Sequence, residues 1–268
     1  MSSAAIDRAT VDYFDSHCHE YGRDRIRGVA RMLAPYVGPE ARMIDVGCGT
    51  GANLARLSRA LGITDLTARD ASEASLERVR ERLPNAQTHC MSLLDEESLA
   101  VLQGEYDVVL MAAVLHHLVG RSRQESRRRA QAGLRMAATL ARPGGLVVVM
   151  EPVFTPVPPW GVLLAPSDTL FWVKRMTTLV TSDRVPLGGY WNNIGAPVVS
   201  FYTAGEVGSM MIRSGLQPLG RRIRRGSVGW MDRVVDRGDA TFVAQVPGGE
   251  PITPRGSRRP RRGGRTRR

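Results

Sequence analysis

The sequence predicts a doubly wound α/β domain with a mainly parallel sheet of seven strands. Two observations carry this prediction. Short apolar runs alternate with longer amphipathic segments over residues 43–150, and a glycine-rich segment at residues 47–51 separates the first apolar run from the first amphipathic one. Apolar strands that alternate with helices are typical of βαβ units, whose right-handed crossovers place helices on both faces of a sheet.

The elements follow one another in a regular order. Residues 5–36 are predicted to be helical, within an N-terminal segment (residues 1–40) that ends in a region rich in proline and glycine. Five strands are expected at residues 43–46, 65–69, 87–91, 106–111 and 146–150. Helices are expected between them at residues 52–61, 72–83, 96–103 and 124–140.

The last part of the domain is expected to differ. Thr203 and Glu206 have the spacing of a capping box and predict a helix that starts there and stops near Gly215. Two more strands, residues 216–224 and 240–246, are joined by a connection long enough for an antiparallel hairpin. The main domain therefore spans residues 41–246.

Two segments stand apart from this rhythm. Residues 152–202 are too long for an ordinary loop and hold eight of the 15 aromatic residues. We expect an insert after the fifth strand that covers a ligand site, although these aromatics can equally serve to pack the insert onto the domain. Residues 247–268 form an arginine-rich tail that we expect to be disordered.

Composition limits the classes of function. The net charge is +11, but the tail carries +7 of it, so the remaining residues are only mildly basic at +4. No stretch has 18 uninterrupted apolar residues, the N-terminus lacks an apolar signal-peptide core, and the three cysteines are too scattered for a disulfide framework. The sequence indicates a soluble, cytoplasmic protein with no membrane association.

The sharpest motif is Asp45-Val-Gly-Cys-Gly-Thr-Gly51, which ends the first strand and opens a helix. Its three glycines permit positive φ angles and let a ligand approach the backbone. The N–H groups of the following helix favour an anionic group such as a carboxylate. The glycine spacing differs from the dinucleotide fingerprint G-x-G-x-x-G.

This motif resembles the first motif of the class I S-adenosylmethionine-dependent methyltransferases, and the resemblance extends over about residues 40–246. It implies a Rossmann-like methyltransferase fold, S-adenosylmethionine as cofactor and S-adenosylhomocysteine as product. Asp70 resembles the acid that binds the ribose hydroxyls. The cofactor contacts implied are Asp45, Gly47, Cys48, Gly49, Gly51, Asp70, Ala71, Met91, Ser92, Leu93 and Ala113, with Tyr13 and Tyr21 from an N-terminal helical lid.

One position departs from the family. Ser92 stands where the family usually has an acid that binds the adenine amino group. Either the Ser92 hydroxyl accepts that hydrogen bond, or Asp95 reaches in instead.

His116 and His117 follow the fourth strand, and Glu151 ends the fifth. Histidine suits removal of a proton from a phenol, acid or amine near neutral pH, and Glu151 is a candidate for orienting a substrate. All three can alternatively serve only to hold their loops. His17-Cys18-His19 superficially suggests a metal site, but neighbouring helical side chains point apart, so no metal is expected.

The favoured function is methylation of an O, N or C atom of a small, largely apolar metabolite in bacterial natural-product biosynthesis. A homodimer is left open. One rival is an RNA or DNA methyltransferase anchored by the basic tail; the mildly basic body makes nucleic acid an unlikely partner. The other is a non-methylating rearrangement on the same fold, because fold does not fix chemistry.

Overall fold

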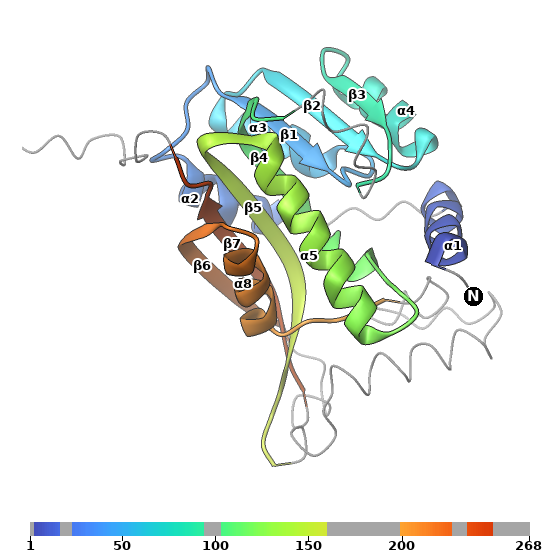
Figure 1. Cartoon of the computed structure of the whole chain (residues 1–268). Helices are drawn as coiled ribbons and strands as arrows, with labels where there is room; N and C mark the ends of the chain where they lie inside the picture. Colours follow the sequence, from blue (N-terminus) through green and yellow to red (C-terminus); the bar gives the residue numbers. More distant parts are fainter. Residues whose placement is uncertain (1–2, 17–22, 94–102, 160–198, 227–234, 249–268) are drawn as a thin grey trace, which may run out of the picture.

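The computed structural model describes residues 3–16, 23–93, 103–159, 199–226 and 235–248. It contains a seven-stranded sheet in the order β3-β2-β1-β4-β5-β7-β6 (Figure 1). The pairs that join β3, β2, β1, β4 and β5 are parallel, whereas β7 is antiparallel to both β5 and β6. The doubly wound sheet and its terminal antiparallel hairpin are therefore confirmed.

The described elements follow the predicted order closely. The strands are β1 (Arg42–Val46), β2 (Asp65–Asp70), β3 (Gln87–Cys90), β4 (Tyr106–Ala112), β5 (Ala141–Pro156), β6 (Gln217–Gly226) and β7 (Val235–Gln245). The helices are α1 (Ser3–Ser16), α2 (Arg23–Leu33), α3 (Ala52–Leu61), α4 (Glu73–Arg82), the short 3-10 turn η2 (Leu115–His117), α5 (Arg123–Leu140) and α8 (Ala204–Arg213). The helix predicted at residues 96–103, most of the insert and the tail lie outside the described residues.

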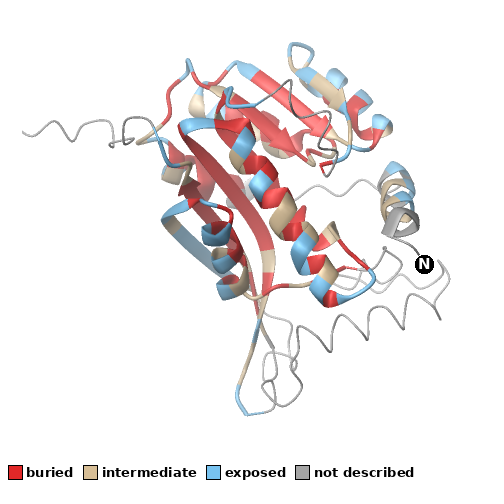
Figure 2. Cartoon of the chain, viewed as in Figure 1, coloured by how far each residue is buried: buried red, intermediate tan, exposed pale blue. Residues whose placement is uncertain are grey.

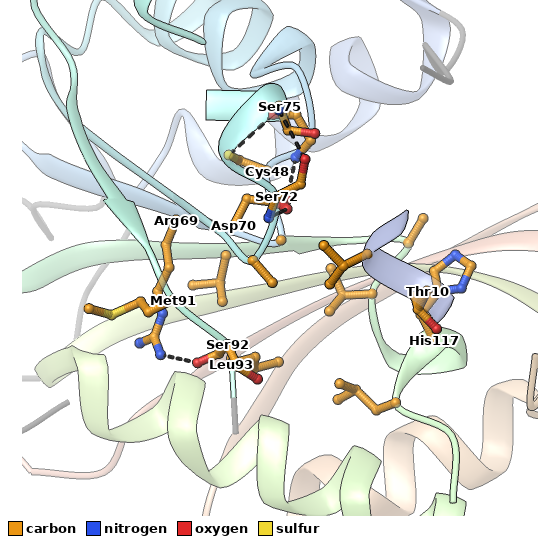
Figure 3. Close-up of a pocket in the computed structure, with 18 of the residues that line it drawn as sticks. Thr10, Cys48, Arg69, Asp70, Ser72, Ser75, Met91, Ser92, Leu93 and His117 are labelled. Carbon is orange, nitrogen blue, oxygen red and sulfur yellow. Dashed lines mark hydrogen bonds between the residues drawn. The ribbon is translucent and has the colours of Figure 1, made fainter. Parts of the chain in front are cut away.

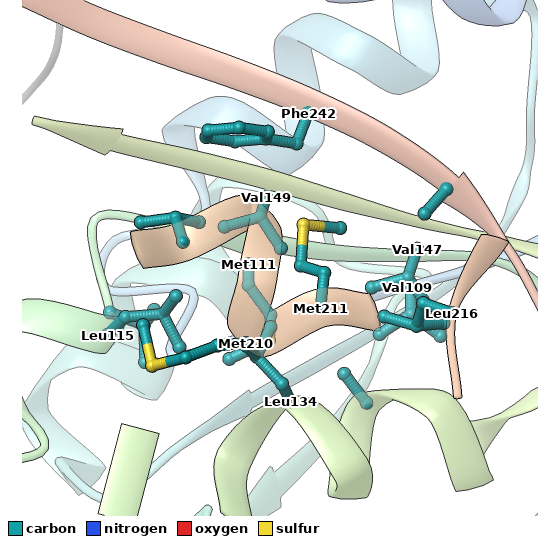
Figure 4. Packing of buried hydrophobic residues seen from close by; sticks show 14 of the residues in the cluster. Val109, Met111, Leu115, Leu134, Val147, Val149, Met210, Met211, Leu216 and Phe242 are labelled. Carbon is teal, nitrogen blue, oxygen red and sulfur yellow. The ribbon is translucent and has the colours of Figure 1, made fainter. Parts of the chain in front are cut away.

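Hydrophobic residues cover both faces of the sheet. On one face, α5 and α8 pack through Leu134, Met210 and Met211 against Val109 and Val149, as Figure 4 shows. On the other face, α2, α3 and α4 pack against the alternate residues of the same strands. Figure 2 shows the result as buried central strands between partly exposed helices. Burial on both faces explains why these strands are apolar runs rather than alternating patterns.

Strand β5 is longer than the predicted 146–150. It pairs with β7 from Leu146 to Pro156, whereas its pairing with β4 ends at Met150. The first residues of the expected insert are therefore strand. Val153 also forms a bridge with Tyr202, and the Phe154 N–H donates to the Tyr202 carbonyl at 3.1 Å. The last part of β5 and the segment just before α8 therefore lie side by side.

The predicted capping box at the start of α8 is present. The Thr203 hydroxyl accepts the Glu206 N–H, and the Glu206 carboxylate accepts the Thr203 N–H. Glu206 also pairs with Arg123, whose side chain is buried and donates to the Phe201 carbonyl at 2.6 Å. This network fixes the chain where it re-enters the domain after the insert.

Candidate active site

The glycine-rich loop between β1 and α3 forms one wall of a cavity (Figure 3). Gly47, Gly49 and Gly51 have φ angles of 69°, 51° and 70°, which side chains rarely adopt. A Cβ at Gly47 would lie 2.6 Å from Val114 Cγ2, whereas a Cβ at Gly49 would meet nothing within 4 Å. Gly47 therefore permits packing against the loop after β4, and Gly49 leaves the cavity open.

Asp70, the last residue of β2, lies opposite this loop. Its two carboxylate oxygens accept the N–H groups of Gly49 at 2.8 Å and Ser72 at 3.0 Å. Burial raises the pKa of Asp70, and these backbone N–H groups partly oppose the rise. Each oxygen retains a free lone pair, so the carboxylate can still accept hydroxyl protons from a ligand.

Two other groups of the loop are buried, and burial raises their pKa values. Burial and the nearby Asp70 carboxylate raise the pKa of Asp45 to about 8, and neither carboxylate oxygen of Asp45 has a hydrogen-bond partner among the described residues. Burial likewise raises the pKa of the Cys48 thiol. Asp45 lies behind the loop and does not line the cavity, and neither does Gly51; Cys48 does line it.

The end of β3 forms the next part of the wall. Met91, Ser92 and Leu93 all line the cavity, as the resemblance implies for the adenine end. The buried Arg69 guanidinium donates to the Ser92 carbonyl, which fixes the backbone there (Figure 3). Asp95, the alternative partner for adenine, lies outside the described residues.

Helix α1 closes the cavity from the side of the N-terminus. Thr10 and Val11 line it, and Asp7 pairs with Arg129 of α5 at 2.5 Å. Farther along the helix, Asp15 accepts a hydrogen bond from the hydroxyl of Ser72, the N-cap of α4. The helix is thus tied to elements on both sides of the cavity. The Tyr13 side chain and Tyr21, expected in this lid, lie outside what the structure describes.

The loop after β4 is held by Glu151 of β5. One Glu151 oxygen accepts the N–H groups of Val114 and Leu115, both at 2.7 Å, and the other lies 2.7 Å from His116 Nδ1. Ala113, just before these residues, has a φ of 62°, which is strained for a residue with a Cβ. The buried carboxylate therefore holds the strained turn in place.

The structure separates the two neighbouring histidines. His116 is 2% exposed, faces Glu151 and does not line the cavity, whereas His117 and Ala113 do. Glu151 is 1% exposed and also lies behind the wall. Of the three expected catalytic residues, only His117 reaches the space where a ligand can lie.

The cavity has a volume of about 310 Å³, within the usual range for small-ligand sites. Side chains such as Val46, Leu93, Val114 and Leu118 make much of its wall apolar. Within the described ranges there is no cluster of residues suited to a metal ion, and none of the described helices is both long and apolar enough to cross a bilayer. His17-Cys18-His19 falls outside those ranges.

Comparison with known proteins agrees with this geometry. Residues 44–147 match the family model described as a methyltransferase domain. The chain is 28% identical over 189 residues to trans-aconitate 2-methyltransferase of Variovorax paradoxus (strain S110), which covers 68% of this chain and 67% of that protein. The family match and this relative support a class I S-adenosylmethionine-dependent methyltransferase.

Other relatives of this methyltransferase differ in chemistry. A carboxy-S-adenosyl-L-methionine synthase of Trichodesmium erythraeum (strain IMS101) is 30% identical over 138 residues, or 51% of this chain and 52% of that protein. The geranyl diphosphate C-methyltransferase of Streptomyces coelicolor A3(2) has the same fold, with a TM-score of 0.58 and 13% identity over 91% of this chain and 99% of that one. The chain thus spans about half to two thirds of the two curated relatives.

The residues of this methyltransferase fit the cofactor of the family, S-adenosylmethionine. Gly49 leaves open space where a side chain would intrude, and Asp70 offers carboxylate lone pairs toward the same cavity. The residues placed to hold it are those of the expected set that line the cavity: Gly47, Cys48, Gly49, Asp70, Ala71, Met91, Ser92, Leu93 and Ala113. When bound, S-adenosylmethionine supplies a methyl group that is already electrophilic.

Several cavity residues of this methyltransferase carry no sequence signal of their own. Arg69 occupies a strand position where an apolar residue is expected, and Asp7, Thr10 and Arg129 come from helices whose orientation the sequence leaves undefined.

Proposed function

We propose that this methyltransferase transfers the methyl group of S-adenosylmethionine to an O, N or C atom of a small, largely apolar metabolite, in the cytoplasm and in bacterial specialised metabolism. The observation that carries the proposal is the position of His117. It lies on the wall of a mainly apolar cavity that also contains the glycine loop and Asp70. A mainly apolar cavity with a histidine on its wall suits a small organic substrate better than a charged polymer.

The chain's residues divide the work. The apolar wall and α1 exclude water and orient the acceptor, which matters because displacement needs close alignment. The ring of His117 takes a proton from an oxygen or nitrogen nucleophile as that atom is methylated. His116 and Glu151 act through the loop, because they hold the turn that carries His117 without touching the cavity.

The first test uses purified full-length chain, methyl-labelled S-adenosylmethionine and an extract of small organic molecules and nucleic acids. Label in the organic fraction is the expected result. Label in RNA or DNA would instead identify a nucleic-acid methyltransferase. Binding of the cofactor with a substrate converted to a product of unchanged mass would identify a non-methylating enzyme.

Deleting residues 247–268 separates the small-molecule and nucleic-acid functions further. A small-molecule enzyme keeps its kcat and KM without the tail. A tail-anchored enzyme loses substrate affinity and its dependence on salt, because phosphate contacts are the salt-sensitive part of nucleic-acid binding.

The role of His117 is tested by comparing it with its neighbour. His117→Ala is expected to lower kcat by about 10²–10⁴-fold while cofactor affinity and thermal stability stay near those of the parent. His116→Ala should lower thermal stability as well, since it leaves the buried Glu151 carboxylate without one partner. Full turnover in His117→Ala would remove the general-base role.

A further inference from the structure

A second hollow lies away from the cofactor cavity, between α2 and the hairpin β6–β7. Its volume is about 280 Å³, and four arginines surround it: Arg27 and Arg31 from α2, and Arg222 and Arg224 from β6. Asp239 and Thr241 of β7 complete the wall.

The backbone geometry brings the four guanidinium groups to one place. Arg27 and Arg31 are four residues apart and share a face of α2, while Arg222 and Arg224 are two residues apart and share a face of β6. In the strand pairing, Arg222 stands opposite Thr241 and Arg224 opposite Asp239. The arrangement therefore follows from regular secondary structure.

Gly28 lets the helix and the strand approach each other. A Cβ at this position would lie 2.7 Å from Nη1 of Arg222 and 3.5 Å from its Cζ. The Arg222 side chain thus lies directly over Gly28, which comes between Arg27 and Arg31 in the sequence of α2. Any other residue at position 28 would push Arg222 aside.

The charges of the hollow are unbalanced. Four arginines face one aspartate, which leaves an excess of three positive charges around the space. Among the side chains that the structure describes, a set that leaves out Asp24, no carboxylate forms an ion pair with Arg27, Arg31 or Arg222. Convergent guanidinium groups repel one another unless an anion lies between them, and their planar forks match phosphate oxygens.

Protection of a sheet edge does not account for this cluster. β6 is an edge strand and is mostly exposed (Figure 2). Charged side chains on such a strand are an expected device against edge-to-edge pairing. Arg221 and Arg225, which point to the other side of β6, serve that purpose equally well. The hollow additionally uses two arginines of α2, a helix that already covers this face of the strand.

We propose that this hollow binds the diphosphate group of a small, soluble phosphate ester. A diphosphate carries about three negative charges, which would balance the excess of three positive charges around the hollow. The volume of the hollow is several times the roughly 30 Å³ of a water molecule, so it has room for such a group. Thr241 offers a hydroxyl donor beside Arg222. The site is distinct from the cofactor cavity, with which it shares no residue.

The test is isothermal titration of the full chain with inorganic pyrophosphate at low ionic strength, with and without S-adenosylhomocysteine. Arg222→Ala and Arg31→Ala are each expected to weaken pyrophosphate binding by about tenfold or more. Arg221→Ala is the matched control, since it removes the same charge from the same strand on the opposite face. It should change the affinity by less than about twofold, because it alters only the screened, long-range field.

Gly28→Ala provides a second variant that keeps all arginines. It is expected to leave thermal stability unchanged or higher, because alanine favours helix, yet to weaken pyrophosphate binding by displacing Arg222. Equal losses in Arg221→Ala and Arg222→Ala would overturn the proposal, since they would indicate diffuse attraction. The absence of pyrophosphate binding would also overturn the proposal. This holds even if vesicles rich in phosphatidic acid bind, because the site would then recognise a lipid surface and not a soluble phosphate ester.

Discussion

Glu151→Gln probes the carboxylate that holds the loop after β4. Glutamine keeps the size and one carbonyl oxygen, so the N–H groups of Val114 and Leu115 retain an acceptor. The negative charge is lost, and the new amide group faces His116 Nδ1, which Glu151 approaches to 2.7 Å. The substitution therefore weakens three contacts without creating a cavity.

The magnitude follows from the number and type of these contacts. Hydrogen bonds to a charged group are worth about 1.5–3 kcal/mol, against about 0.5–1.5 kcal/mol for neutral ones. Two amide contacts that become neutral and one disturbed histidine contact together predict a loss of about 2–4 kcal/mol in the free energy of unfolding. Because Val114 packs against Gly47, cofactor affinity should fall as well.

The assay is urea unfolding followed by circular dichroism, together with calorimetric titration of S-adenosylhomocysteine. Glu73→Gln is the control, since Glu73 is exposed and its contacts with Arg80 and Cys90 lie at the surface; it should unfold like the parent. A Glu151→Gln chain that unfolds at the parent's urea midpoint, with the same slope and the same cofactor affinity, would refute the reasoning.

Three further predictions concern the glycine-rich loop and helix α1. Because the Asp45 pKa is raised to about 8, the folded chain holds a proton that the unfolded chain releases near pH 4, so the free energy of unfolding in urea should fall by about 1.4 kcal/mol per pH unit between pH 4 and 8. Asp45→Asn should lack this part of the pH dependence. The same pH dependence in the variant and the parent would contradict the raised pKa of Asp45. A residue with a Cβ at the positive φ of Gly47 costs roughly 1–2 kcal/mol, and Gly47→Ala should lower the free energy of unfolding by more than this because the new Cβ meets Val114. Gly49→Ala should mainly reduce cofactor affinity, measured by calorimetry. Asp7→Asn removes the ion pair between α1 and α5 and should therefore speed proteolytic cleavage within α1. An unchanged rate of cleavage would argue that this ion pair does not hold α1 against the cavity.

The sequence could predict which residues line the cavity at the strand ends, where the cofactor is proposed to bind. Parallel strands end at one edge of the sheet, so residues 47–49, 70–71 and 91–93 meet there once the strands are found. The capping box of α8 was also predictable, since both partners are local in sequence.

The division between His116 and His117 was not predictable. They lie side by side in a 3-10 turn, and which ring faces the cavity depends on the strained conformation of Ala113 and on Glu151, 35 residues away. The pairing of Asp7 with Arg129 similarly joins residues 122 positions apart. Such contacts depend on how helices dock, which local patterns do not encode.

The bridge between Val153 and Tyr202 has a consequence for engineering. The segment between these residues begins and ends at one point, where Arg123 and the capping box hold the returning chain. Lengthening a loop whose ends are already joined costs little, about 0.6 kcal/mol for each doubling. Residues 157–198 should therefore be exchangeable with the corresponding segment of another enzyme, so that new substrates can be sought by grafting while the cofactor half of the sheet is left as it is.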